Sequence, residues 1–195
     1  MKKLILILMM ITTASAVYAA TAQDVIAGLK KINTYSAEFV QTTEIEGFGE
    51  DQYSGKLFIN RGKGALWDYD KPYRQFYLFD TSTMKYYDSE TKQVVVQKLD
   101  PSTNVFMRLM LSPEDIEKDF SVTLNGSELH MMPKGDLGIA EIVFIVKNGV
   151  VAGIRTKDQN GNNTNIELKN ISIDKELPKR VFAPEVPVGT EIFYY

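Results

Sequence analysis

Three Asn-Gly pairs constrain the fold of this chain more than any other feature. They are Asn125-Gly126, Asn148-Gly149 and Asn160-Gly161, and segments with alternating apolar and polar residues flank each of them. Asn and Gly both tolerate positive φ, so an Asn-Gly pair between such segments is typical of the two-residue turn of a β-hairpin. We therefore expect a run of neighbouring antiparallel strands here. These strands cover 120–124, 128–132, 139–147, 150–156 and 164–173.

The same period-two alternation runs through the first half of the chain from Tyr35 onward. It predicts strands over 36–45, 52–60, 65–69, 74–79, 84–87 and 93–99. About eleven consecutive antiparallel strands usually curl into a barrel or a half barrel. Three prolines punctuate the segment after Leu177, which we expect to lie along an edge of the sheet. The fold class predicted is mainly β, an incomplete, half-open antiparallel barrel.

The first residues have the pattern of a cleavable signal peptide. Two lysines precede the apolar run 4–11, and small residues follow up to Ala16 and Ala19. Signal peptidase reads this spacing, and cleavage after Ala16 fits nearly as well as cleavage after Ala19. No Cys follows the apolar run, so the N-terminus of the chain cannot be lipidated. We predict a signal peptide over 1–19 and one exported domain over 20–195.

Charge and residue usage argue against several classes of function. Removing the two lysines of the signal from the 22 basic residues leaves 20 against 25 acidic residues, a net charge of −5. Nucleic-acid binding needs a basic face, so we expect no nucleic-acid partner. The chain has no Cys and one His, His130, in a predicted strand. Its neighbours Met131 and Met132 point to opposite strand faces, which argues against copper ligation. We expect no catalytic residue, no metal and no cofactor; a small hydrolase built on His130 stays open as an alternative.

Three segments have a helical pattern, one before the first predicted strand and two in the middle of the chain. Apolar residues recur at helical spacing over 23–33, including Val25, Ile26 and Leu29. The stretch 104–111 is apolar almost all round and carries one charge, Arg108. Because so apolar a helix must be buried, we expect it over the concave side of the sheet. Its predicted lid residues are Val105, Phe106, Leu109 and Met110. A second short helix is predicted from Ser112-Pro113 to about Lys118.

The first half of the sheet carries many aromatic residues. In 76–79 and 94–96 both faces of a strand are apolar, so the sheet must be covered on both sides or line a cavity. The alternative is an ordinary packed core. We expect four aromatic residues to line an apolar cavity: Phe58, Trp67, Phe76 and Tyr86.

Several short motifs resemble the outer-membrane lipoprotein carrier family, LolA. They are Phe39-Val40-Gln41-Thr42, Gly55 to Arg61, Leu66-Trp67-Asp68-Tyr69 with Pro72, Asp80 with Met84 to Asp88, and Phe182 to Gly189. The spacings from Arg61 to Trp67 and from Trp67 to Pro72 match those of the family. The chain departs from the family pattern at Gly62, Ala65 and Thr81. It is similar to a divergent member over nearly its whole mature length.

The resemblance implies a carrier rather than an enzyme. It implies a helical lid over an apolar cavity, with Arg61 in the position of an arginine that hydrogen-bonds the lid backbone and holds it closed. The implied partners are acylated lipoproteins, the inner-membrane transporter LolCDE, and an outer-membrane acceptor that is LolB-like or the membrane itself. The expected location is the periplasm, and the expected state is a monomer. The alternatives are a binding protein or sensor for another lipid or glycolipid, and a β-domain that binds nothing.

Overall fold

The computed structural model describes residues 20–80, 82–98, 109, 111 and 116–195. Twelve strands form a single sheet in the order β12-β6-β5-β4-β3-β2-β1-β11-β10-β9-β8-β7. The first six strands are β1 (Thr34–Ile45), β2 (Gly49–Asn60), β3 (Gly64–Lys71), β4 (Gln75–Phe79), β5 (Thr83–Asp88) and β6 (Gln93–Lys98). The others are β7 (Phe120–Asn125), β8 (Glu128–Pro133), β9 (Ile139–Lys147), β10 (Val150–Asp158), β11 (Asn163–Ile173) and β12 (Glu191–Tyr194).

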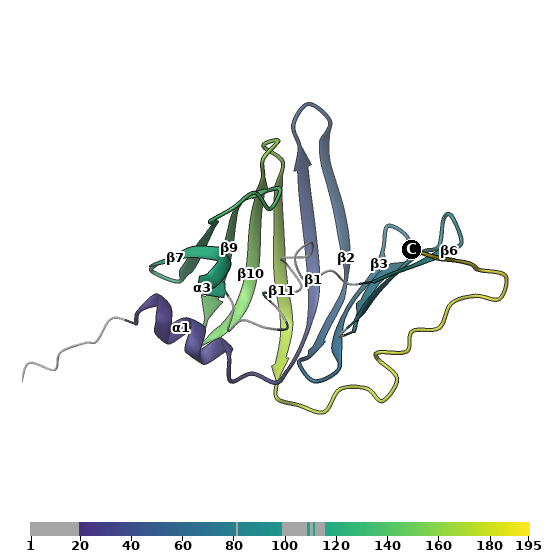
Figure 1. Cartoon of the computed structure of the whole chain (residues 1–195), viewed down its shortest axis with the longest axis horizontal. Helices are drawn as coiled ribbons and strands as arrows, with labels where there is room; N and C mark the ends of the chain where they lie inside the picture. The colour runs from purple at the N-terminus through teal and green to yellow at the C-terminus, as the bar shows by residue number, and fades with distance from the viewer. Residues whose placement is uncertain (1–19, 81, 99–108, 110, 112–115) are drawn as a thin grey trace, which may run out of the picture.

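The sheet is open, as the half-barrel prediction required. Its edge strands are β7 and β12, and each has one neighbour among the described residues. Every pairing is antiparallel except that of β12, which runs parallel to β6. Helices α1 (Ala22–Leu29) and α3 (Ile116–Asp119) lie beside the β7 to β10 end of the sheet, and the C-terminal segment runs past the opposite end (Figure 1). In the described part of the chain, no helix combines the length and the hydrophobicity needed to span a membrane.

The hairpin predictions are confirmed where Asn-Gly pairs join strands. The turn between β9 and β10 holds Asn148 at φ 52° and Gly149 at φ 77°, the left-handed region that this pair tolerates. Gly126 and Gly161 also have positive φ in their turns. The sheet has twelve strands instead of about eleven, because the last residues pair with β6 along the edge of the sheet.

Helix α1 is shorter than the predicted helix over 23–33. Its first turn is closed by a capping box, in which the Asp24 amide donates to Thr21 Oγ1 at 3.2 Å and the Thr21 amide donates to Asp24 Oδ2 at 2.9 Å. After Leu29 the chain tightens, since the Ile32 amide donates to the Leu29 carbonyl at 3.2 Å. This tighter turn ends the helix and leads into β1.

The two faces of the sheet bury separate apolar clusters, which we call the inner and the outer cluster. The inner cluster lies between the sheet and the helices. Its large members are Ile26, Leu29, Tyr35, Phe39, Leu57, Trp67, Leu109, Ile116, Phe120, Leu129, Met131, Ile142, Phe144, Ile154, Ile166 and Leu168. The outer cluster is buried under the C-terminal segment. It consists of Leu66, Phe76, Leu78, Tyr87 and Val94, with Phe58, Val96, Val181, Phe182 and Val186 half-buried around them.

Phe58 and Phe76 therefore lie on the face opposite to the one expected from the sequence. Phe58 pairs with Leu66 across β2 and β3, whereas its neighbour Leu57 pairs with Trp67. Successive residues of a strand point to opposite faces, so one pair joins the outer cluster and the other joins the inner cluster. Phe76 belongs to the outer cluster and packs on Tyr87 with ring centroids 5.4 Å apart.

Replacing Phe182 with Ala should test the role of the C-terminal segment as a cover for the outer cluster. Phe182 is half-buried against that cluster, so its loss should lower the free energy of unfolding by about 1–2 kcal/mol. Urea unfolding followed by tryptophan fluorescence measures this change. Val188→Ala is a matched control, since Val188 is fully exposed on the same segment. Equal stability of the two variants would contradict the packing described here.

Candidate functional site

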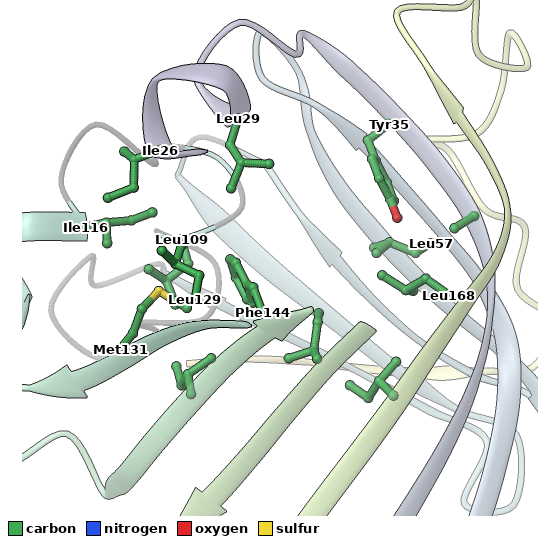
Figure 2. Packing of buried hydrophobic residues seen from close by; sticks show 14 of the residues in the cluster. Ile26, Leu29, Tyr35, Leu57, Leu109, Ile116, Leu129, Met131, Phe144 and Leu168 are labelled. Atoms are coloured by element: carbon green, nitrogen blue, oxygen red, sulfur yellow. The ribbon is translucent and has the colours of Figure 1, made fainter. Parts of the chain in front are cut away.

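An apolar cavity of about 70 Å³ lies between the end of α1 and the inner face of the sheet. It is lined by Leu29, Ile32, Asn33, Tyr35, Leu57, Ile59, Arg61, Leu109, Phe144, Val151, Ile154 and Leu168. Leu29 projects from the helix toward the sheet, while Tyr35, Leu57 and Leu168 project from the strands across the space (Figure 2). Most of this lining is hydrocarbon, so the cavity suits an apolar ligand.

The strands supply the cavity wall through their alternation. Leu57 and Ile59 are two residues apart on β2 and so share the inner face, and Ile59 pairs with Tyr35 on β1. The Tyr35 hydroxyl donates to the Val151 carbonyl at 2.7 Å. Burial raises the pKa of Tyr35, which keeps the hydroxyl protonated as a donor. Because this polar group already has a partner, the wall around it is effectively apolar.

Arg61 closes one end of the cavity by binding the end of α1. It follows β2, and its Nη1 and Nη2 donate to the carbonyls of Lys30 and Leu29, each at 2.6 Å. Its backbone amide also donates to the Asn33 carbonyl at 3.1 Å. The last carbonyls of a helix lack partners within the helix and carry partial negative charge. The guanidinium satisfies them and holds Leu29 over the cavity.

The structure brings together only some of the residues proposed from the sequence. Leu29, Arg61 and Leu109 line the cavity. Ile26 is buried in the inner cluster, and Val25 is half-buried against it. The predicted lid residues Val105, Phe106 and Met110 lie outside the described residues.

The two remaining predicted aromatic residues lie on the inner face but do not line the cavity. Trp67 is buried in the inner cluster, where its ring meets that of Phe39 at 5.4 Å. Tyr86 stacks on Tyr77 with centroids 4.6 Å apart, and its hydroxyl donates to Asp88 Oδ2 at 2.9 Å. Tyr86 thus extends the aromatic row from Trp67 toward β6.

Sequence reasoning missed most of the strand residues around the cavity. The missed residues are Tyr35, Leu57, Ile59, Phe144, Val151, Ile154 and Leu168 on the strands, and Asn33 directly before β1. Alternation could have grouped the residues within each strand, since Leu57 and Ile59 are two residues apart. It could not have shown that β2, β10 and β11 face the same helix, because that depends on how the sheet curls around α1.

The single His lies elsewhere, in an ordinary polar cluster. His130 Nδ1 is 2.7 Å from Glu141 Oε1, and its Nε2 is 3.4 Å from Glu128 Oε2. Arg155 also pairs with Glu128, at 2.6 Å. The ring nitrogens of His130 thus face carboxylates, not a hydroxyl that they could activate as a nucleophile. Among the described residues, no three His, Cys, Asp or Glu side chains gather where they could hold a metal ion.

An open curved sheet with helices over an apolar cavity defines this protein as a half-barrel with an apolar interior. The chain belongs to the outer membrane lipoprotein carrier protein LolA family, whose sequence profile matches residues 30–185. The resemblance found in the sequence motifs is thereby confirmed. The predicted half-open barrel with an N-terminal helix is confirmed as well, whereas most of the predicted central lid falls outside the described residues.

One sequence relative carries the name of this family, and two solved structures share the fold alone. The outer-membrane lipoprotein carrier protein of Methylococcus capsulatus is 28% identical over 173 residues, which cover 85% of this chain and 83% of the relative. An uncharacterized conserved protein of Thermus thermophilus has a similar fold, with a TM-score of 0.59, 12% identity and coverage of 89% and 99% of the two chains. A LolA superfamily protein of Nitrosomonas europaea gives a TM-score of 0.51, with 12% identity and coverage of 85% and 99%.

Proposed function

We propose that this protein is a periplasmic chaperone that carries acylated lipoproteins toward the outer membrane and shields their acyl chains in the cavity beneath α1. The observation that carries the proposal is the apolar cavity closed by Leu29, Leu109 and Arg61, in a chain of the lipoprotein carrier family. Members of that family are carrier chaperones, so no reaction and no cofactor enter the proposal.

The size of the cavity supports a carrier that opens to load. At about 70 Å³ it is well below the roughly 300–1,000 Å³ of pockets that hold small ligands. An acyl chain can enter only if side chains now in the space move away. Leu29 and Leu109 are the described residues best placed to do so, since both come from outside the sheet. In this proposal the structure represents the closed form of the carrier, in which Leu29 and Leu109 fill the space that cargo would take.

Because Leu29 and Leu109 fill the cavity when no cargo is bound, they also explain how the carrier could release its cargo. Each acyl CH₂ removed from water contributes roughly 0.8 kcal/mol, so three long chains would gain tens of kcal/mol. That exceeds the ceiling of about 18–21 kcal/mol for non-covalent affinity, and such a carrier would hold its cargo permanently. If cargo displaces Leu29 and Leu109, their exposure offsets much of this gain. Arg61 adds to the offset, because its two hydrogen bonds to α1 must break on opening.

The proposed partners are those that the family resemblance implies, and the energetics above gives each of them a role. Loading against the closed state needs an energy source, which the inner-membrane transporter LolCDE would supply. Unloading needs a site that is more favourable for the acyl chains, either a LolB-like acceptor or the outer membrane itself. We propose that the carrier works as a monomer in the periplasm between these two partners.

Mass spectrometry of the carrier purified from the periplasm tests the proposal. We expect acylated lipoproteins to co-purify with the wild-type chain and to be released by detergent. The purification should be run beside an unrelated periplasmic protein with the same tag, which should carry none. Recovery of free phospholipid or glycolipid without acylated protein would instead support a carrier for another lipid and contradict the lipoprotein assignment.

A further inference from the structure

Asp174 holds an unusual backbone conformation directly after β11. Its φ is 51°, in the left-handed region that residues other than Gly rarely adopt. Asp tolerates this region better than most residues, but the conformation persists only where surrounding contacts maintain it. Those contacts point to what Asp174 does.

The hydrogen bonds of Asp174 reach Asn33 and Thr34, where the chain enters β1. Its Oδ1 accepts hydrogen bonds from the backbone amides of Asn33, at 2.7 Å, and Thr34, at 3.3 Å. The Asp174 amide donates to the Thr34 carbonyl at 2.8 Å. The Thr34 hydroxyl donates to the carbonyl of Lys175 at 2.8 Å. One carboxylate and its neighbour thus fix both residues at the start of β1 to the end of β11.

Arg61 holds the same junction from the other side. Its backbone amide donates to the Asn33 carbonyl at 3.1 Å, but its guanidinium binds a part of the junction that Asp174 does not reach. Strand β1 lies between β2 and β11, so Arg61 and Asp174 approach the junction from the two neighbouring strands. The Arg61 guanidinium binds the Leu29 and Lys30 carbonyls, at the end of α1. Asp174 binds Asn33 and Thr34, at the start of β1. The short segment from Lys30 to Ile32 lies between the two attachments.

We propose that Asp174 is a positioning residue that fixes the pivot on which α1 moves. When the Arg61 bonds break, α1 and Leu29 swing away from the cavity on the segment 30–32, while Asp174 keeps Asn33 and Thr34 in the sheet. The helix then returns to the same place when cargo leaves. This inference rests on the proposed function, because it assumes that α1 uncovers the cavity during loading.

Three substitutions separate the carboxylate from the backbone conformation. Asp174→Ala removes the acceptor and keeps a Cβ, Asp174→Gly removes the acceptor and relieves the left-handed strain, and Asp174→Asn keeps an acceptor in a residue that tolerates positive φ. In hydrogen exchange of the cargo-free protein, we expect the amides from Ile26 to Thr34 to exchange about tenfold faster in the Ala and Gly variants. The Asn variant should behave like the wild type.

Asp158 provides the matched control. It accepts backbone hydrogen bonds from Asn160 and Asn162, each at 2.9 Å, in the turn between β10 and β11. Asp158→Ala removes a similar number of bonds and should leave exchange in α1 unchanged. A Gly variant at 174 that matches the wild type would show that only the turn conformation matters, and it would overturn the proposal. Faster exchange confined to Asn33 and Thr34, with none in α1, would overturn it too.

Lipoprotein transfer from the loaded carrier to vesicles containing its acceptor then separates the two proposals. We expect slower transfer by the Ala and Gly variants than by the Asp158→Ala control. If wild-type protein carries no acylated cargo but α1 exchange still responds to Asp174, the pivot stands and the carrier function fails. If the wild type transfers cargo and the Ala variant transfers it equally well, the pivot fails and the carrier function stands.

Discussion

Arg61→Leu should still accept lipoprotein from the transporter but deliver it about tenfold more slowly than the wild type. The guanidinium makes two hydrogen bonds to α1 in the closed state, each at 2.6 Å. Hydrogen bonds to a charged group contribute about 1.5–3 kcal/mol when shielded, and less when water reaches them, as it does at Lys30. Losing about 1.4 kcal/mol of closed-state stability shifts the equilibrium about tenfold toward the open, cargo-holding form.

The direction of this effect follows from where the bonds are made. They exist only when α1 covers the cavity, so they oppose cargo and favour its release. Leu fills similar space but cannot satisfy the carbonyls of Leu29 and Lys30. Lipoprotein bound per carrier should therefore stay the same or rise, while transfer to acceptor-containing vesicles falls. Both quantities can be measured with one radiolabelled or fluorescent lipoprotein.

Two further variants test whether Arg61 acts as a latch, that is, whether its hydrogen bonds hold α1 closed over the cavity. Arg61→Lys keeps the charge but replaces the two-pronged donor with a single ammonium, so it should lie between Leu and the wild type. Arg180→Leu removes an arginine whose side chain is 86% exposed on the C-terminal segment, and it should transfer normally. If Arg61→Leu loads and unloads at wild-type rates, Arg61 is a structural cap of α1 and not a latch.

The strand order of the second half could be predicted from the sequence because local signals determine it. Asn148-Gly149 favours one turn geometry, and that turn makes β9 and β10 neighbours whatever surrounds them. The same reasoning gave β7 with β8 and β10 with β11. The end of α1 was harder to predict, since the apolar spacing continues to Ile32. The helix ends at Leu29 instead, where the chain tightens and Arg61 binds the carbonyls of Leu29 and Lys30.

Which face of each strand is functional could not be predicted. In β4 both faces are apolar, so alternation alone cannot tell the face of Phe76 from that of Tyr77. The difference arises from the C-terminal segment, which returns over one hundred residues later in the chain to cover the outer face with Val181 and Phe182. The residue pattern within one strand does not show which face a segment so far away in the sequence will cover. The inner face is left for the helices, and the cavity forms there.

Because different segments cover the two faces of the sheet, substitutions on the two faces should have different effects on stability and cargo binding. The outer cluster is covered by a segment that ends in a paired strand, so filling or emptying it should affect stability alone. The inner cluster is covered by α1, which is attached through a few hydrogen bonds at its end and through apolar contacts. Substitutions there should change cargo binding even where they leave the folded state intact.

Val151→Phe should accordingly lower the affinity for acylated cargo by about tenfold or more without lowering stability. Val151 is half-buried at the cavity wall, and its carbonyl already accepts the Tyr35 hydroxyl. A phenyl ring at this position occupies space that exists in the closed state, so it gains burial and adds little strain. Cargo must then displace the ring as well as Leu29, and one buried Phe side chain corresponds to roughly 1.5–3 kcal/mol.

Val188→Phe is the matched control for this variant, because it adds the same ring at a fully exposed site on the C-terminal segment. Cargo binding can be measured by titrating each protein with a fluorescent triacylated lipopeptide, and stability by thermal unfolding. Unchanged affinity in Val151→Phe would place the acyl chains outside the cavity beneath α1. A fall in melting temperature with unchanged affinity would show that the space is packed core, and that α1 does not give way to cargo.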